Sequence, residues 1–299
     1  MAKKILITGA SGLIGAKLTS QLQAKTHSVA HLGRKKKEGP IASFVWDVNQ
    51  NNIDLSALEN TDTIVHLAGA NVSDKRWTAS WKKEILDSRV QSTKLLVETL
   101  KNNKHTVKTF VSASAIGYYG FEGDSVFTED SAAGKDFLAQ VTKQWEEEVD
   151  KVASLGIRVV KIRIGIVLSE KGGALEKMVL PIKYGIGSPL GSGKQYVSWI
   201  HINDLCQMFI KAIEDENMKG AYNASANWVT NAEMTKAIAN ILKRLLFAPK
   251  VPSFVLKIVL GEMAEIVLNG SKISSEKMRK TGFQFQFESL NEALIDLLK

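Results

Sequence analysis

A glycine-rich turn after the opening apolar run is the first feature of the chain that could do chemistry. The segment TGASGLIG, residues 8–15, follows KILI and carries glycines at every third position. Such glycines permit a tight turn, let backbone approach a pyrophosphate, and allow close packing of helix on strand. A helix N-terminus also attracts phosphates. We predict a dinucleotide phosphate site, with a plain strand-to-helix turn as the alternative, formed by Gly9, Ser11, Gly12, Leu13, Ile14 and Gly15.

The second apolar run ends in a basic segment that would select the nucleotide. The sequence HLGRKKK, residues 31–37, has no acidic residue before Glu38. An acid at this place accepts the ribose 2′-hydroxyl of NAD, whereas an arginine accommodates a 2′-phosphate. Arg34 can form a forked pair with a phosphate, and Lys35 adds charge nearby. We therefore predict NADP(H) as the cofactor, against the alternative of a solvated basic loop.

Two further runs end in residues suited to the same nucleotide. Asp47, followed by Val48, ends the third run, where an acid could accept from the adenine amino group or cap a turn. Small residues in HLAGA end the fourth run, where bulk would collide with a ribose. The predicted contacts there are Leu67, Ala68, Gly69 and Ala70.

Alternating strands and helices must position these residues. Short apolar runs without polar alternation are typical of strands buried on both faces, and stretches with helical spacing separate them. This order predicts an α/β fold with a doubly wound parallel sheet of the Rossmann type. We expect this nucleotide domain over residues 1–167, with a strand near 221–225 returning to it. A smaller substrate lobe is expected over residues 168–299, with its own C-terminal domain from about 248.

Composition narrows the classes of function. The 299 residues carry a formal net charge of +8, yet no zinc-finger or basic-region pattern supports nucleic acid as a partner. The single cysteine fits a reducing compartment, and the histidines lack the paired spacing of a metal site. No signal peptide or bilayer-length apolar run is present. These features predict a cytoplasmic protein with a small-molecule substrate, no membrane partner and no metal.

Motifs along nearly the whole chain resemble those of the extended short-chain dehydrogenase/reductases, which include nucleotide-sugar epimerases. They are, in order, TGASGLIG, HLAG, SASAIGYYG, RIGIVLS and WIHINDL. Within that group the chain is most similar to the uncharacterised "epimerase family" oxidoreductases that carry a C-terminal domain of their own. The segment over residues 74–93 and the tail from residue 260 onward support this narrower resemblance.

The resemblance implies hydride transfer at the nicotinamide, with a tyrosine as proton donor and a lysine four residues later. It assigns the serine role to Ser114 and the lysine role to Lys143, but the tyrosine position is Ala139. A phenol has a pKa of about 10, and a nearby cation lowers that pKa so that the phenol can exchange a proton at neutral pH. Without a tyrosine at position 139, the chain lacks the usual proton donor. Either Tyr118 or Tyr119 replaces it, or the substrate needs no side-chain acid, or the protein binds nucleotide without turnover. Each residue also has a structural alternative: pocket wall for the tyrosines, backbone contact for Ser114, and a surface ion pair with Glu146 or Glu147 for Lys143.

Three more residues are predicted to contact the substrate. Arg76 and Arg89 lie in the segment after the fourth strand, where either could bind a carboxylate or phosphate. His201 precedes Asp204 in WIHINDL; Asp204 is expected to cap the next helix, with packing beneath that helix as the alternative role of His201. The C-terminal helices are expected either to close the pocket or to form a homodimer contact.

The sequence thus predicts an NADP-dependent oxidoreductase of the extended short-chain type that lacks the usual tyrosine. A non-catalytic NADP(H)-binding sensor and a nucleotide-sugar epimerase remain the alternatives.

Overall fold

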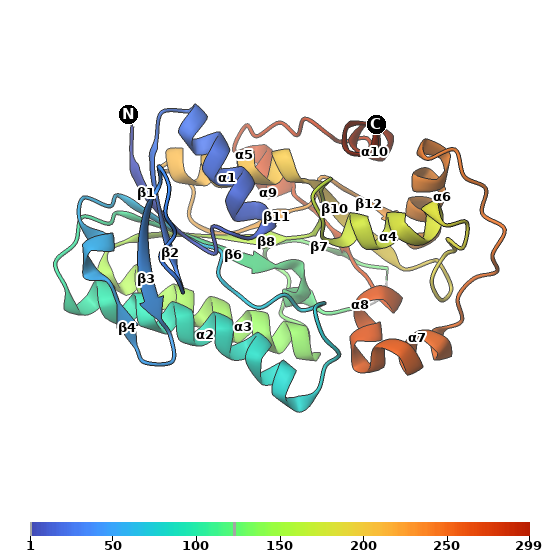
Figure 1. The fold of residues 1–299 in the computed structure, drawn as a ribbon, viewed down its shortest axis with the longest axis horizontal. Helices are drawn as coiled ribbons and strands as arrows, with labels where there is room; N and C mark the ends of the chain where they lie inside the picture. The colour runs from blue at the N-terminus through green and yellow to red at the C-terminus, as the bar shows by residue number, and fades with distance from the viewer. Residues whose placement is uncertain (1, 122–123) are drawn as a thin grey trace.

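Eight strands form the main sheet of the computed structural model, which describes residues 2–121 and 124–299 (Figure 1). Their order is β11-β8-β6-β5-β1-β2-β3-β4, and all neighbours are parallel except β3 and β4. The predicted doubly wound parallel sheet is confirmed. The strands are β1 (Lys4–Thr8), β2 (Ser28–Gly33), β3 (Ala42–Asp47), β4 (Asn52–Ile53), β5 (Thr63–His66), β6 (Thr109–Ala115), β8 (Arg158–Ile164) and β11 (Gly220–Ala224).

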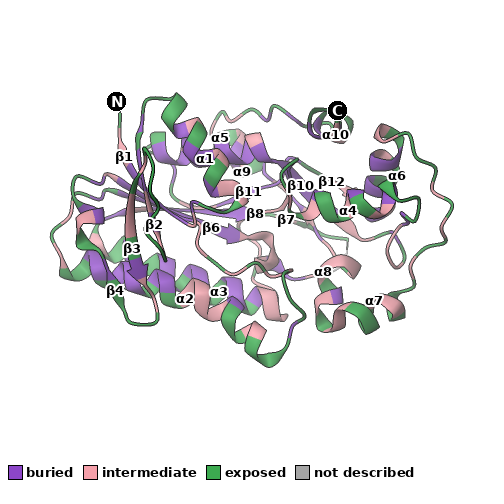
Figure 2. Cartoon of the chain, viewed as in Figure 1, coloured by how far each residue is buried: buried purple, intermediate pink, exposed green. Residues whose placement is uncertain are grey.

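Helices cover both faces of this sheet, which explains why its strands are apolar without alternation. Figure 1 shows α1 (Leu13–Ala24) and α5 (Ile202–Glu214) on one face, with α2 (Ala79–Asn102) and α3 (Phe137–Asp150) on the other. The helices bury the sides that meet the sheet and expose the opposite sides (Figure 2).

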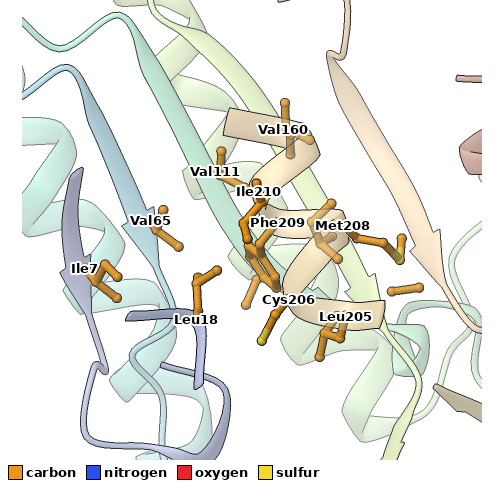
Figure 3. Packing of buried hydrophobic residues seen from close by; sticks show 14 of the residues in the cluster. Ile7, Leu18, Val65, Val111, Val160, Leu205, Cys206, Met208, Phe209 and Ile210 are labelled. Carbon is orange, nitrogen blue, oxygen red and sulfur yellow. The ribbon is translucent and has the colours of Figure 1, made fainter. Parts of the chain in front are cut away.

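The helix α5 shows how this packing involves the single cysteine. Leu205, Cys206 and Phe209 of α5 are fully buried and lie against the strands (Figure 3). Burial raises the pKa of the Cys206 thiol to about 12, so it stays protonated as a core residue.

The chain changes direction across the sheet between β1 and β5. From β1 the chain builds outward to β2 and β3 on one side, and then to β5, β6 and β8 on the other. At such a switch point the loops after two neighbouring strands diverge, leaving a crevice at their carboxyl ends. The glycine turn after β1 and the loop after β5 therefore lie on the two sides of one crevice.

Smaller elements extend the molecule beyond the carboxyl edge of the main sheet. A three-stranded sheet has the order β12-β10-β9, and β7 pairs with β13 from the C-terminal part of the chain. Their bounds are β7 (Val126–Phe127), β9 (Ile166–Leu168), β10 (Tyr196–His201), β12 (Asn227–Thr230), β13 (Lys272–Ile273), α4 (Ala174–Lys183) and α6 (Asn231–Ile241), with single 3-10 turns η1 (Leu55–Leu58), η2 (Ile116–Tyr119) and η3 (Lys151–Leu155).

Hydrogen bonds to a buried carboxylate of α5 hold the C-terminal segment in place. Asp204 of α5 accepts from the backbone N–H groups of Gln286 and Phe287, at 2.8 and 3.0 Å. The expectation that Asp204 caps its own helix is therefore wrong, because its carboxylate binds a distant backbone segment. The elements of this segment are α7 (Ser253–Leu260), η4 (Gly261–Ala264), α8 (Glu265–Leu268), α9 (Glu276–Lys280) and α10 (Leu290–Leu298).

Candidate functional site

The glycine turn between β1 and α1 approaches the end of β5 so closely that side chains would not fit. Gly9 has a φ of 66°, and a Cβ there would lie 2.7 Å from the carbonyl carbon of Leu67. A Cβ on Gly15 would lie 2.5 Å from the Gly9 carbonyl oxygen. Gly12 is the N-cap of α1, and in the described structure no side chain caps this helix end. Its first N–H groups are thus available to an anion in the crevice.

A buried hydrogen-bond chain holds the β5 loop against β1. The backbone N–H groups of Leu67 and Ala68 both donate to Thr8 Oγ1, at 3.1 and 3.2 Å. Since this oxygen accepts twice, its own proton goes to His66 Nδ1, 2.8 Å away. The other ring nitrogen, Nε2, then donates to Thr93 Oγ1 at 3.1 Å. His66 positions the loop that lines the crevice, a role that the sequence reasoning missed.

His66 should make the protein sensitive to acid. Burial, with the charge of Arg89, lowers the pKa of His66 to about 3. Below about pH 6.5 the imidazole of the unfolded chain takes up a proton, whereas that of the folded protein does not. The free energy of unfolding therefore decreases as the pH is lowered from about 6.5 toward about 3. We expect urea unfolding to show a loss of about 2 kcal/mol between pH 7 and pH 5 from this residue. The pH slope should flatten by about one proton in His66→Gln; an unchanged slope would contradict this assignment.

The residues predicted to bind the adenosine end lie beyond β2 and β3. Arg34 and Lys35 directly follow β2 and are exposed. Asp47 Oδ1 accepts from the N–H groups of Asn49 and Gln50, at 2.9 and 3.2 Å, so the turn-capping role is present. Val48, next to it, is packed against the core.

Lys143 and Ser114 differ in how far they are exposed to solvent. Its side chain is 59% exposed on α3, with the ammonium 3.9 Å from Glu147 Oε1, whereas Ser114 is buried. The buried side of α3 carries Ala139, Thr142 and Glu146. The surface ion pair, which was the alternative role of Lys143, is present and is formed with Glu147.

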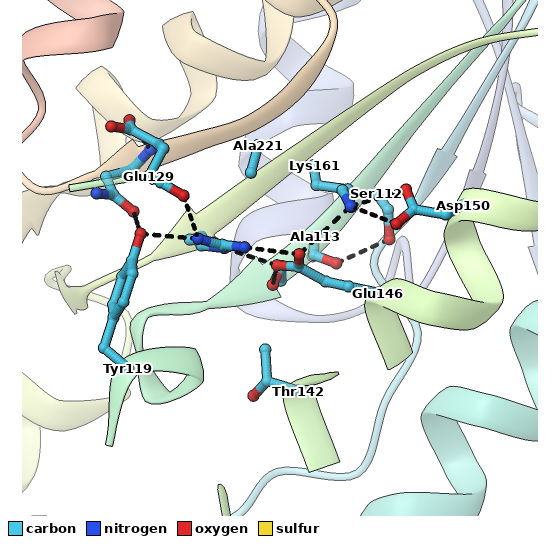
Figure 4. Close-up of polar contacts among 12 residues, drawn as sticks. Ser112, Ala113, Tyr119, Glu129, Thr142, Glu146, Asp150, Lys161 and Ala221 are labelled. Atoms are coloured by element: carbon cyan, nitrogen blue, oxygen red, sulfur yellow. Dashed lines mark hydrogen bonds and ion pairs between the residues drawn. The ribbon is translucent and has the colours of Figure 1, made fainter. Parts of the chain in front are cut away.

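Ser114 instead belongs to a buried ionic network between β6, α3 and β8 (Figure 4). Its hydroxyl donates to Glu146 Oε1 at 2.6 Å, and Arg163 binds both carboxylate oxygens, at 2.8 and 2.9 Å. Lys161 lies 3.4 Å from the same carboxylate. Burial opposes the charge of Glu146, but these partners together hold its pKa below the ordinary value. The Ser114 proton is thus committed to a carboxylate and is not free for a substrate oxygen.

The two neighbouring tyrosines differ sharply in their surroundings. Tyr119 is buried; its hydroxyl donates to Asn223 Oδ1 at 2.6 Å and accepts from Arg163 Nη1 at 2.9 Å. Burial raises the pKa of Tyr119 to about 12. Tyr118 is half-buried, with its ring centroid 3.5 Å from the Arg163 guanidinium carbon. Tyr119 therefore completes the buried network, and Tyr118 is the phenol that the network leaves aside.

The three residues predicted to contact substrate have separate positions. Arg76 is exposed and donates to the Ile258 carbonyl of α7 at 3.3 Å. Arg89 is half-buried against Gly69 at the end of β5. His201 is fully buried: its Nδ1 accepts from the Asn203 N–H and caps α5, while Nε2 contacts Asp296 at 3.1 Å. The prediction of His201 as a substrate contact is wrong, because both ring nitrogens are used within the fold.

Within residues 2–121 and 124–299, no group of three or more His, Cys, Asp or Glu side chains could hold a metal ion. No helix in those ranges has the length and apolar character needed to cross a bilayer.

Family models match two consecutive parts of the chain. The NAD dependent epimerase/dehydratase family matches residues 5–225, which include all of the main sheet except Lys4, the first residue of β1, together with the glycine turn and the loop after β5. A domain of unknown function, DUF1731, matches residues 251–297, which form the C-terminal segment.

Similar proteins extend over the same length. An epimerase family protein of Staphylococcus haemolyticus is 37% identical, with 99% of each chain covered. A chloroplastic homolog of epimerase family protein SDR39U1 from Arabidopsis thaliana is also 37% identical, over 97% of this chain and 85% of its own length. Among solved structures, the human epimerase family protein SDR39U1 with NADPH matches with a TM-score of 0.87 and 32% identity, covering 98% of each chain.

Proposed function

The chain belongs to the NAD dependent epimerase/dehydratase family, and we propose that it is an oxidoreductase that uses NADP(H) with a small carbonyl or alcohol substrate. The observation that carries the proposal is the approach of the glycine turn to the end of β5, beside an uncapped helix. The crystal structure of the human relative with NADPH supports the choice of nucleotide.

The residues at the crevice fit this cofactor. Backbone N–H groups after Gly12 would bind the pyrophosphate, and Arg34 with Lys35 would bind the additional phosphate on the adenosine ribose. Asp47 keeps its Oδ2 outside the turn that Oδ1 caps, which leaves it for the adenine amino group. The nicotinamide half would then extend past the β5 loop toward β6, where it would exchange a hydride with the substrate.

The proton of the reaction is assigned to Tyr118. Ser114 donates its proton to Glu146, Tyr119 donates to Asn223, and Lys143 pairs with Glu147 on the exposed side of α3. Tyr118 is on η2, the turn that directly follows β6 at the carboxyl edge of the sheet. The Arg163 guanidinium over its ring would stabilise the phenolate as the hydroxyl proton passes to the substrate oxygen.

Paired phenylalanine substitutions separate Tyr118 from Tyr119. We expect Tyr118→Phe to lower kcat about 100-fold or more with the NADPH Kd unchanged, because general acid catalysis contributes that much. Tyr119→Phe should instead lower the free energy of unfolding by about 1–2 kcal/mol, since Asn223 and Arg163 each lose a buried partner. The test is steady-state kinetics on a substrate found by an NADPH-consumption screen of aldehydes and ketones, together with urea unfolding. A Tyr118→Phe protein of full activity would remove Tyr118 from the reaction.

A non-catalytic NADP(H) sensor is the second candidate. It is favoured by the commitment of Ser114 and Tyr119 to the buried network and by the ion pair between Lys143 and Glu147. The same screen decides between the two functions. Consumption of NADPH with any carbonyl compound above the uncatalysed rate supports the oxidoreductase, whereas binding without consumption across the whole panel supports the sensor.

A further inference from the structure

An exposed apolar surface lies at the end of the molecule where Figure 1 shows α4, α6 and α7. No residue from 241 to 263 is buried, although this stretch contains the apolar helix α7. The six most exposed large apolar side chains of the described residues all belong to this end, and each is at least 66% exposed. They are Tyr184, Ile186, Leu245, Phe247, Phe254 and Ile258.

A hydrogen bond holds together the two chain segments that carry these side chains. Ser188, after α4, donates through its hydroxyl to the Pro249 carbonyl, before α7, at 2.7 Å. Ile186 and Phe247 each lie two residues before this contact in their own segments. The exposed apolar side chains are therefore gathered at one place, which is typical of a surface that contacts a protein or a membrane.

The same two segments account for the whole net charge of the chain. Residues 177–194 and 234–261 hold eight of the 39 basic residues and none of the 31 acidic ones, so the rest of the chain is formally neutral. All eight basic residues are exposed, and they alternate with the apolar side chains, as Lys257 precedes Ile258 in α7. Among the residues that the structure describes, no carboxylate oxygen lies within 4 Å of any of these eight cations. We call the two segments together the basic apolar surface.

Apolar and cationic groups in this combination fit a membrane that contains anionic phospholipids. Exposed aliphatic and aromatic side chains enter the acyl boundary, while the lipid phosphates bind the cations around them. A second copy of the chain fits less well, because a symmetric contact would bring the same cations of both subunits together. A nucleic acid would bind the cations but would leave aliphatic side chains such as Leu245 and Ile258 without an apolar partner.

We propose that the basic apolar surface docks the protein onto a membrane rich in anionic phospholipids. The sequence-based expectation of no membrane partner rests on the absence of an apolar run of bilayer length, and a surface contact needs no such run. Docking of this kind involves neither the glycine turn nor the buried network, so it holds or fails independently of the proposed oxidoreductase function.

Flotation of the full-length protein with lipid vesicles tests the proposal. Vesicles of equal parts phosphatidylglycerol and phosphatidylcholine are compared with vesicles of phosphatidylcholine alone. We expect binding to the anionic vesicles to be stronger by about tenfold or more at low salt, because each basic side chain near an anionic surface adds to the attraction. High salt should release a large part of the bound protein.

Paired substitutions separate the apolar contribution from the charged one. Phe247→Ser combined with Phe254→Ser removes two exposed rings without changing the net charge. Lys243→Gln combined with Arg244→Gln removes two cations and leaves the rings in place. Each pair should weaken binding to anionic vesicles about tenfold or more. All four residues are exposed, so urea unfolding of both variants should match that of the wild-type protein.

Two control variants lie outside the surface. Lys104→Gln combined with Lys108→Gln removes two other exposed cations, and Leu55→Ser changes an apolar side chain that is 49% exposed on η1. Each control should change vesicle binding by about twofold or less. The proposal is overturned if the wild-type protein does not float with anionic vesicles, if the surface pairs bind as the wild type does, or if the lysine control loses as much binding as the Lys243 and Arg244 pair. A dimer seen by ultracentrifugation without lipid, and lost in the phenylalanine pair, would also overturn it and assign the surface to a second copy.

Discussion

Replacing Glu146 by alanine is expected to lower the free energy of unfolding by about 3–5 kcal/mol, because it leaves the buried charge of Arg163 without its carboxylate partner. Arg163 and Lys161 are 4% and 8% exposed, and the Glu146 carboxylate lies within ion-pair distance of both. Ser114 would lose its acceptor in the same step. Urea unfolding at pH 7 measures the change.

The neighbouring residue supplies the control for this effect. Glu147 lies one position further along α3, is 61% exposed, and pairs only loosely with Lys143. Exposed pairs of this kind contribute about 0–1 kcal/mol, so Glu147→Ala should be nearly neutral. Similar losses in the two variants would show that the buried network does not determine the result.

Reversing the charge of Arg34 is expected to weaken NADPH binding about 100-fold while changing NADH binding little. Hydrogen bonds to a charged group contribute about 1.5–3 kcal/mol each, and the introduced carboxylate would also repel the phosphate. The residue is exposed at the end of β2, so Arg34→Glu should not disturb folding. Calorimetric titration of the variant with each nucleotide gives both affinities.

Lys36→Glu is the matched control, since it places the same charge change two residues further along the same exposed segment. It should lower NADPH affinity only about two- to threefold through long-range charge, and salt should reduce that effect. If Lys36→Glu weakened NADPH binding as much as Arg34→Glu, the basic segment would act through its total charge and not through a specific contact.

Features that depend on local sequence could be predicted. The glycine turn could be predicted because it depends on the backbone freedom of neighbouring residues. The buried strands and the helices between them could be predicted because the local pattern of apolar residues shows which faces meet the core. The glycine turn therefore lies at the crevice, and the strand expected near 221–225 is β11, which pairs with β8.

Features that depend on distant contacts could not be predicted in the same way. The face of α3 that meets Ser114 is set by how the chain between β6 and α3 folds, and Glu146, three residues after Lys143, is the residue that accepts from the Ser114 hydroxyl. Asp204 binds backbone at residues 286 and 287, and His66 binds hydroxyls from β1 and α2; no spacing within the sequence records either contact. Glu146 in a predicted helix and Arg163 in a predicted buried strand are visible in the sequence. Their pairing could be recognised only once the position of α3 on the sheet was known.

The central claim is that the glycine turn binds the pyrophosphate of the nucleotide and that Arg34 binds the additional phosphate of NADPH. Calorimetric titration of the wild-type protein with NADPH and NADH tests both contacts most directly. The account predicts saturable heat with NADPH and an affinity for NADH lower by about tenfold or more, the difference of one charge-assisted contact. Equal affinities would contradict the role of Arg34. The absence of heat with either nucleotide at millimolar concentration would contradict the nucleotide site itself.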